Sequence, residues 1–178
     1  TNLSSTSNSR TLITNLSGYG IYGITIYNGF LYISNYSDNN IYRVSLSSAN
    51  SHNGQSNLAF TYYGTSGSGT GPQGICFDNR GYLYIGNYNT KSVTVLNTNA
   101  TFLRTITAPS GYDNATWSAS VNFTPGANGK YWLWFGSEGA CQLARADVTN
   151  VATTAISASL ANIKRVGKTN GGHVAVNS

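Results

Sequence analysis

The sequence has little charge of either sign, and its charges do not cluster. Only 8% of the 178 residues are charged, against roughly 25% in an ordinary soluble domain. Ten lysines and arginines exceed five acids and give a net charge of +5, but only Lys164, Arg165 and Lys168 lie close together in the sequence. A nucleic-acid surface needs a basic stripe interleaved with exposed aromatics. We therefore expect no nucleic-acid partner.

Long apolar runs and methionine are also missing. No apolar run approaches the roughly 20 residues that cross a bilayer, so we expect no membrane span. The chain has no methionine and begins at Thr1. We therefore expect that a leader has been removed, or that the chain is a segment of a longer protein. The predicted location is secreted or at the extracellular surface.

Uncharged hydroxyl and amide side chains fill the place of the missing charges. Solubility must come from these groups or from something attached to them, and attached sugar fits because Asn-X-Ser/Thr sequons are frequent. A chain so rich in Asn, Ser and Thr also produces sequons by chance. The predicted glycosylation sites are Asn2, Asn15, Asn35, Asn99, Asn114 and Asn122.

Cysteine and histidine are scarce. The two cysteines, Cys76 and Cys141, permit a disulfide between adjacent sheets, and two buried free thiols are the alternative. His52 and His173 are far apart in the sequence. Two isolated cysteines and two distant histidines are a poor set of metal ligands, so these residues predict no metal site and no cofactor.

The sequence contains one passage twice. GIYGITIYNGFLYISNYSDNNIYRVSL begins at Gly20, and GPQGICFDNRGYLYIGNYNTKSVTVLN begins at Gly71. Each copy consists of short alternating runs separated by glycine turns, with a repeat of about fifty residues. Such repeats form stacks or rings of small antiparallel sheets. The predicted fold class is all-β, a β-propeller-like array of four-stranded antiparallel blades.

Both copies predict four strands in the same order. The first hairpin turns at Asn28-Gly29, a dipeptide that favours the positive φ of a tight turn. Gly23 and Gly74 lie in the inner strands, which crowd around a common axis, and a missing Cβ permits close approach there. The predicted strands are 21–27, 30–34, 41–45 and 58–63, then 74–78, 82–87, 92–96 and 102–108.

A third, more divergent copy begins near Ser118. Val121-Asn122-Phe123 corresponds to Cys76-Phe77, and Leu133-Trp134-Phe135-Gly136 corresponds to the second strand of the earlier copies. The third strand is predicted at 142–148. The outer edge is predicted at 152–160 and 162–166, with a short helix as the alternative, because its alanines permit a helix and its β-branched residues oppose one.

The two ends of the chain resemble single strands of further blades. Residues 10–17 resemble the outer strand that begins at Arg104, and residues 171–177 resemble the inner strand of the second copy. Three blades are too few to close a ring of four to eight, and open strand edges pair with other chains. Other protein subunits, or the rest of a longer chain, are the expected partners. The predicted boundaries are a partial blade at 1–18, blades at 20–65, 71–109 and 117–167, and the first strand of a further blade at 171–178.

The string GPQGICFDNRGYLYIGNYNTKSVTVLN resembles the NHL repeat, which has a Gly-Ile-Ala-Val-Asp strand, a Gly-Asn-Leu-Tyr-Val strand and an Arg-Ile-Gln-Val-Phe strand. LYIGNYNTKSVTVLN also resembles the YVTN-type repeats of microbial surface proteins. The chain departs from the NHL pattern at Asn35 and Asn87, where Asp is common, and at Tyr27, where the second copy keeps Asp78. The resemblance covers 20–47 and 71–108 well, 118–148 less closely, and the ends in part.

The NHL resemblance implies a β-propeller that is either a binding module or an enzyme, since it covers calcium-dependent lactonases and a zinc-dependent lyase. A lactonase-like site needs several acidic and amide oxygens around one calcium, so calcium stays open as a cofactor. Turn-stabilising roles are the favoured reading for the acids, because turns use Asp for its own backbone hydrogen bonds. The acids are Asp38, Asp78, Asp113, Glu138 and Asp147.

An amide and a tyrosine recur in register at the end of the second strand of each copy. Asn35-Tyr36 and Asn87-Tyr88 should therefore lie on the same rim of successive blades. Flat rings near turns can stack on sugars or partner chains, although most aromatics at alternating positions fill the space between blades. The predicted binding residues are Tyr36, Asn87 and Tyr88.

Together these patterns predict a glycosylated, extracellular or cell-surface β-propeller-like protein that acts in binding or assembly. Terminal strand pairing would make it a subunit of a filament or surface layer. Two alternatives stay open, an NHL-like metal-dependent lactonase or lyase seen as a partial ring, and a carbohydrate-binding module. No catalytic constellation is recognisable, so no catalytic residue is predicted and an enzyme is the less favoured reading.

Overall fold

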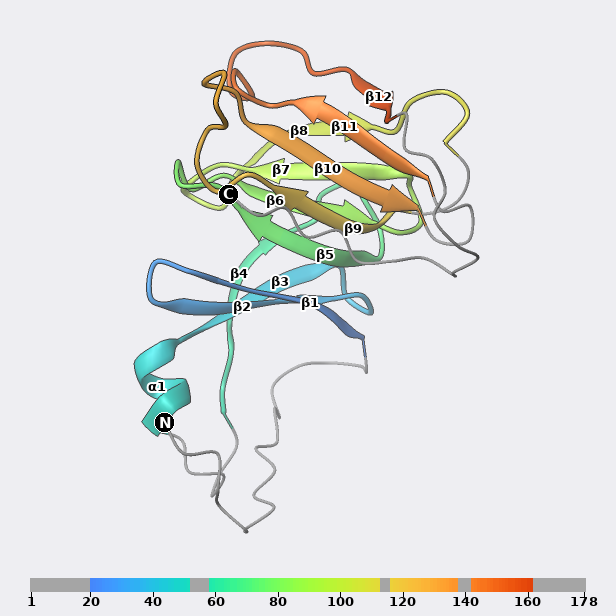
Figure 1. Cartoon of the computed structure of the whole chain (residues 1–178). Coiled ribbons are helices and arrows are strands. Elements are labelled where there is room, and N and C mark those ends of the chain that lie inside the picture. The colour runs from blue at the N-terminus through green and yellow to red at the C-terminus, as the bar shows by residue number, and fades with distance from the viewer. Residues whose placement is uncertain (1–19, 52–57, 113–115, 138–141, 162–178) are drawn as a thin grey trace, which may run out of the picture.

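The part of the chain that the structure describes folds as three four-stranded antiparallel sheets (Figure 1). The computed structural model describes residues 20–51, 58–112, 116–137 and 142–161. This arrangement confirms the predicted all-β, propeller-like fold class. The predicted partial blades at 1–18 and 171–178 lie outside the described residues. No helix in the described part of the chain is long and apolar enough to cross a membrane.

The first sheet begins with a tight hairpin. Asn28 and Gly29 have φ values of 44° and 77°, which are the left-handed values that a two-residue type I′ turn requires. The predicted turn is therefore confirmed, and it fixes the register in which Tyr27 pairs with Phe30. The strands of the first sheet are β1 (Ile21–Tyr27), β2 (Phe30–Asn35), β3 (Asn40–Ser45) and β4 (Thr61–Thr65).

A short helix follows β3, where the sequence predicted no regular structure. It is α1 (Leu46–Ser51). Ser45 precedes it, and the Ser45 Oγ accepts a hydrogen bond of 3.1 Å from the Ser48 backbone N–H. This is the N-cap arrangement, in which a serine hydroxyl satisfies a free N–H of the first helical turn.

The outer strand of the first sheet begins at Thr61, three residues after the predicted start at Leu58. Leu58 and Phe60 do not pair with β3. They pack instead with Val44, on the face of the first sheet that points away from the second. The apolar residues before β4 thus contribute to packing rather than to the hydrogen-bonded ladder.

The second sheet lies between the other two (Figure 1). Every residue of its two central strands is buried, whereas in β1 only Gly23 is buried. Both faces of the second sheet are covered because one apolar cluster joins it to the first sheet and another joins it to the third. Its strands are β5 (Pro72–Phe77), β6 (Leu83–Asn87), β7 (Ser92–Leu96) and β8 (Phe102–Thr107).

The third sheet corrects one correspondence that the sequence predicted. Leu133 pairs with Val121 as Leu83 pairs with Phe77, so the inner strand ends at Val121 and the predicted match was displaced by two residues. A longer connection, which closes with its own turn at 126–130, absorbs the difference. The strands are β9 (Thr116–Val121), β10 (Trp132–Ser137), β11 (Leu143–Asp147) and β12 (Ala158–Leu160).

The segment before β12 forms turns, not the helix that the sequence left open. Val151 N–H donates to the Val148 carbonyl at 3.1 Å, and Thr154 N–H donates to the Asn150 carbonyl at 3.0 Å. Within the described residues, the outer edge of the third sheet is the three-residue strand β12. The second part of the predicted edge, 162–166, lies outside them.

Inner strands approach one another closely at their glycines, as predicted. Gly23 of β1 lies against the backbone of Gln73 in β5, and Gly74 of β5 lies against the backbone of Ser118 in β9. Ser34 supports the first approach, because its hydroxyl accepts from Gly23 N–H at 2.8 Å and donates to the Gln73 carbonyl at 2.7 Å. The three inner strands therefore run side by side.

Candidate functional site

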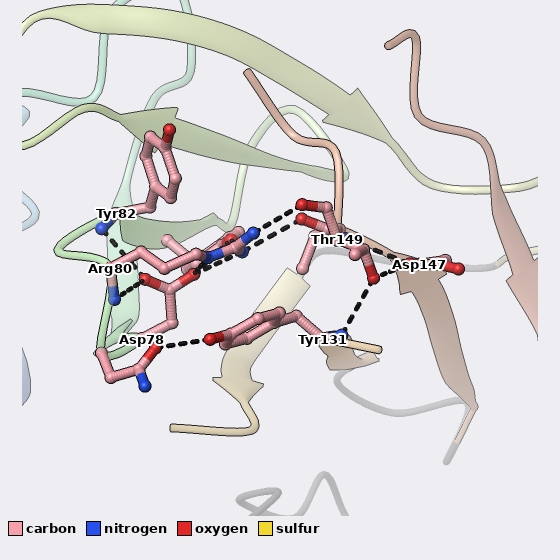
Figure 2. Close-up of polar contacts among 9 residues, drawn as sticks. Asp78, Arg80, Tyr82, Tyr131, Asp147 and Thr149 are labelled. Carbon is pink, nitrogen blue, oxygen red and sulfur yellow. Dashed lines mark hydrogen bonds and ion pairs between the residues drawn. The ribbon is translucent and has the colours of Figure 1, made fainter. Parts of the chain in front are cut away.

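Asp78, at the end of β5, is a fully buried carboxylate. Its Oδ1 accepts hydrogen bonds from the backbone N–H groups of Arg80 (3.0 Å) and Tyr82 (3.2 Å). Its Oδ2 accepts from the Arg80 guanidinium at 2.6 and 3.0 Å and from the Tyr84 hydroxyl at 3.1 Å (Figure 2). Burial, followed by the Asp78 charge, raises the pKa of Tyr84. Both Asp78 oxygens are engaged, so this carboxylate anchors structure and is not a free base or ligand.

Arg80 joins the second sheet to the third. Its Nη1 donates to the Thr149 carbonyl at 2.6 Å, and its Nη2 donates to the Val148 carbonyl at 3.1 Å. The guanidinium carbon lies 3.7 Å from the ring centroid of Tyr131 and 5.1 Å from that of Tyr82, as Figure 2 shows. A planar cation with rings beside it and carbonyls at its edge is held in one geometry. We call Asp78 and Arg80 the inter-sheet clamp.

Asp147 holds the turn that faces Arg80. Its Oδ1 accepts from the backbone N–H and the hydroxyl of Thr149 at 3.0 and 2.6 Å, and its Oδ2 lies 2.8 Å from Lys130 Nζ. The Lys130 hydrogen bond, and then that of Thr149, lower the pKa of Asp147 to about 2. Asp147 therefore stays ionised at neutral pH and fixes the carbonyls that Arg80 contacts.

The described acids stabilise turns, which was the favoured prediction. Asp38 Oδ1 accepts from the backbone N–H two residues later at 3.0 Å, and Asp78 and Asp147 make the same bond, which defines an Asx turn. Across 20–51, 58–112, 116–137 and 142–161, no three His, Cys, Asp or Glu side chains lie close enough together to hold a metal ion. Asp113, Glu138, His52 and His173 lie outside the described residues.

The predicted tyrosines come together at one rim, where β2 and β6 end. The Tyr36 ring centroid lies 6.1 Å from that of Tyr88 and 5.5 Å from that of Tyr22, both edge-to-face. The Tyr36 hydroxyl donates to Asn89 Oδ1 at 3.2 Å. Tyr22 is 52% exposed, and the other two rings are partly buried. We call Tyr22, Tyr36 and Tyr88 the tyrosine rim. It spans the first and second sheets.

The amides of the same repeat are interior. Asn35 and Asn87 are both fully buried. Asn35 Oδ1 accepts from Ser37 N–H at 3.1 Å, and Asn87 Nδ2 donates to Thr94 Oγ1 at 2.9 Å. A ligand in solvent cannot reach Asn87 in this arrangement, and a glycan has no room at Asn35. These two residues shape the strand ends beneath the tyrosines.

Two other predicted glycosylation sites lie within the described residues. Asn99 is exposed between β7 and β8, and Asn122 is partly buried just after β9. The backbone N–H of Asn99 donates to Asn97 Oδ1 at 2.9 Å. This hydrogen bond stabilises the turn that carries the exposed Asn99 side chain. Asn2, Asn15 and Asn114 lie outside the described residues.

Cys76 is a free thiol on β5. It packs against the apolar cluster between the second and third sheets, and burial raises the pKa of its thiol. A thiol held in its neutral form is a poor nucleophile and a poor metal ligand. The predicted disulfide partner, Cys141, lies outside the described residues.

One face of the first sheet leaves aliphatic side chains open to solvent. Ile24 and Ile26 of β1 are 67% and 61% exposed. The strand registers place them where the second sheet has Ile75 and Phe77, which are 5% and 4% exposed because they pack on the first sheet. We call this side of a sheet its aliphatic face.

The opposite side of each sheet, its aromatic face, carries rings, and in the third sheet these are tryptophans. Trp132 and Trp134 of β10 are partly buried, and Arg145 of β11 is exposed beside them. The Arg145 guanidinium lies 5.0 and 5.9 Å from their ring centroids. The sequence did not predict this surface. An arginine lies opposite an aromatic residue in both sheets, Arg145 opposite Trp134 and Arg43 opposite Tyr32. This repeated pair is the pattern from which the surface could have been predicted.

Comparison with solved structures places the fold among β-propellers. The chain is similar to Kuenenia stuttgartiensis hydrazine synthase, with a TM-score of 0.58 and 15% identity over 88% of this chain and 38% of that one. It is similar to a streptogramin B lyase, with a TM-score of 0.57 and 17% identity over 83% and 43% of the two chains. For virginiamycin B lyase from Staphylococcus aureus, the TM-score is 0.54 at 17% identity over 82% and 42%.

These neighbours are β-propellers, and at such low identity the likeness concerns the fold alone. The chain spans about two fifths of their lengths, namely 38%, 42% and 43%. No protein-family model matches the chain, and no curated protein matches it significantly. The likeness to NHL and YVTN repeats therefore stays a resemblance of motifs.

Proposed function

We propose that this chain is an assembling β-propeller unit whose activity is to bind other protein chains through its open ends. The observation that carries the proposal is the exposure of Ile24 and Ile26, at 67% and 61%, in positions that the second sheet buries against a neighbouring sheet. Burial of an isoleucine side chain contributes about 1.5–3 kcal/mol. An apolar face of this kind stabilises association when another surface covers it.

Strand pairing at the ends is the second part of the proposal. Residues 10–17 and 171–177 resemble single blade strands, and a strand without a partner offers a row of free N–H and C=O groups to another chain. Repeated pairing of this kind would build a filament or a surface layer. The YVTN resemblance, which is to microbial surface proteins, is consistent with that role.

An extracellular, glycosylated setting completes the proposal. It rests on the low charge of the chain, 8%, and on the exposed sequon at Asn99. Intact mass before and after enzymatic deglycosylation of protein from its natural source tests it. A mass decrease, with the sugar mapped to Asn99, would support the proposal, and a mass equal to the bare chain would contradict it.

Light scattering coupled to size exclusion tests assembly. We expect the mass of the full chain to rise in multiples of the protomer as concentration increases, because association through exposed apolar faces and strand edges is bimolecular. Sedimentation velocity on the same samples separates defined oligomers from aggregates. A protomer mass at every concentration would contradict assembly.

Carbohydrate binding is a second candidate, favoured by the tyrosine rim. The Tyr36 ring centroid lies 5.5 Å from that of Tyr22 and 6.1 Å from that of Tyr88, and Tyr22 is 52% exposed. The three rings form a platform on which a sugar ring can stack. A glycan array with the wild-type chain and the variants Tyr36→Ala and Tyr88→Ala tests this. Tyr62→Ala, at a 59% exposed tyrosine of β4, is the matched control. Binding that both rim variants retain would exclude the rim.

A metal-dependent lactonase or lyase is the least supported candidate. The three described aspartates are each engaged in their own turn, and Asp78 is also saturated by Arg80 and Tyr84. The lyase names of two structural neighbours belong to those proteins. Titration calorimetry with calcium, and metal analysis of the natural protein, test this candidate.

A further inference from the structure

The three sheets use one repeating contact to pack on one another. The aromatic face of the first sheet meets the aliphatic face of the second, where the Tyr32 and Phe77 ring centroids lie 4.7 Å apart. The aromatic face of the second sheet meets the aliphatic face of the third, where Tyr84 packs in one cluster with Val121 and Phe135. The order of faces is thus the same at both contacts.

This order leaves two complementary faces at opposite ends of the described part. One is the aliphatic face of the first sheet, with Ile24 and Ile26, and the other is the aromatic face of the third sheet, with Trp132, Trp134 and Arg145. Figure 1 shows that β1–β4 and β9–β12 flank the second sheet on its two sides. We propose that these two end faces bind each other between copies of the chain. This inference rests on the proposed function and names the surfaces that carry it.

The third sheet repeats the side chains that form the internal contact. Strand register places Trp132, Trp134 and Arg145 where the first sheet has Phe30, Tyr32 and Arg43. In the first sheet this combination is the surface that receives the second sheet. The first sheet in turn offers Ile24 and Ile26 at the positions of Ile75 and Phe77. The same chain therefore carries both halves of a contact that it already makes internally.

An arginine does not prevent such a contact. Arg43 lies in the internal contact, 4.6 Å from the ring centroid of Phe30 and 5.0 Å from that of Tyr63, and it is partly buried there. A guanidinium that stacks on aromatic faces loses less on desolvation than an ammonium would. Arg145 already stacks on Trp132 and Trp134, so it can be partly buried in an intermolecular contact as Arg43 is in the internal one.

The contact is limited to one half of the aliphatic face. Ile33 and Val44, on the same side of the first sheet, are already 2% and 7% exposed, and they cluster with Phe60 and with Ala49 of α1. The open part is therefore the side formed by β1, with Ile24 and Ile26. A neighbouring third sheet would cover that side.

Such a contact joins different surfaces of two identical chains. Each added copy leaves one aliphatic and one aromatic face free, so association continues until a ring closes or a filament grows. An isologous dimer, in which the same patch meets itself, would stop at two copies. Stoichiometry thus distinguishes the proposed arrangement from other modes of self-association.

Two variants test the contact, one for each face, in the full-length chain. The first is Ile24→Asp with Ile26→Asp, and the second is Trp134→Ala with Arg145→Glu. Each should weaken self-association at least tenfold, because each places charge on, or removes a ring from, one side of the contact. Phe102→Ser, at a 50% exposed phenylalanine of β8, is the control and should assemble like wild type. Far-UV circular dichroism and thermal unfolding verify that the variants fold.

Mixing the two variants gives the decisive result. Each retains one intact face, and the intact faces are complementary, so the mixture should form one-to-one pairs that do not grow further. If wild type assembles and the face variants assemble equally well, the inference is overturned, and of the proposed function only assembly through strand edges stands. If the mixture forms no pairs, the head-to-tail contact is overturned. If wild type is monomeric, both fail. Should a double variant unfold, Arg145→Glu alone, at an exposed side chain, gives the same readout.

Discussion

Gly23 and Gln73 come from different sheets, and no side chain separates them. A Cβ at Gly23 would lie 1.9 Å from the Gln73 carbonyl oxygen, which is far inside van der Waals contact. The equivalent Gly74 would bring a Cβ to 2.7 Å from Ala119 N. The inner strands can lie this close together only because Gly23 and Gly74 have no Cβ atom.

Gly23→Ala and Gly74→Ala should therefore each lower the free energy of unfolding by more than about 2 kcal/mol, because the atoms they meet are backbone and cannot rotate away. Chemical denaturation monitored by tyrosine and tryptophan fluorescence measures the change. Gly126→Ala is the matched control, since its nearest neighbour is the Lys130 carbonyl at 3.7 Å, and a change within about 0.5 kcal/mol is expected. Equal stability of all three variants would contradict the close approach.

Arg80→Ala should destabilise the fold by about 3–5 kcal/mol, because it leaves the fully buried Asp78 carboxylate without its cation. The double variant Asp78→Asn with Arg80→Ala should recover part of this loss, since the uncompensated charge is then gone. Urea unfolding of the two variants provides the comparison. A loss below about 1 kcal/mol for Arg80→Ala would show that the clamp is dispensable.

Asp147 should make stability depend on acid. Its pKa falls from 3.8 to about 2 in the fold, so its contribution is present above about pH 4 and disappears as pH falls through 2. Asp147→Asn should be less stable than wild type at pH 7 by at most about 1 kcal/mol, because Asp147 and Lys130 are 33% and 48% exposed and solvent screens them. The difference in melting temperature between the two proteins should shrink between pH 4 and pH 2. A constant difference would assign the effect to packing.

Cys76 should be unreactive in the folded chain, because burial raises the pKa of its thiol and little thiolate forms. The variant Cys141→Ser should give no reaction with a thiol reagent at pH 8 until denaturant is added. Alkylation of wild type in denaturant without reductant, followed by mass analysis, separates the two sequence readings. Two modified cysteines are expected, because Cys76 is a free thiol in the structure, and none would indicate a Cys76 to Cys141 bridge instead.

The fold could be predicted because its signals are local and repeated. Asn28-Gly29 specifies a tight turn by its own backbone preference, and the alternation in β7 (Ser92–Leu96) specifies a strand whose bounds match the prediction. Repetition then extended these local signals along the chain. Where the repeat changed length, as in the connection between Val121 and Trp132, the correspondence failed by two residues.

The sites could be predicted only in part, because their contacts are distant in sequence. Arg80 bonds to the Thr149 carbonyl, 69 residues away in the sequence, and no local pattern predicts that contact. Asn87 was predicted at the rim together with Tyr88, but a strand end can place neighbouring side chains on opposite sides, and only the tyrosine reaches the surface. Alternation along a strand predicts that neighbouring side chains point to opposite faces of the sheet. It does not predict which of the two faces is exposed to solvent.

No residue of the middle strands β6 and β7 is exposed, so these strands should be the last part of the described fold to unfold. Amide hydrogens there should exchange with solvent only after a flanking sheet has unfolded, whereas β1 and β12 are end strands of their sheets within the described residues. Under heat, denaturant or proteolysis the first and third sheets should therefore unfold before the second. Residues 83–96 should be the last to lose protection from hydrogen exchange.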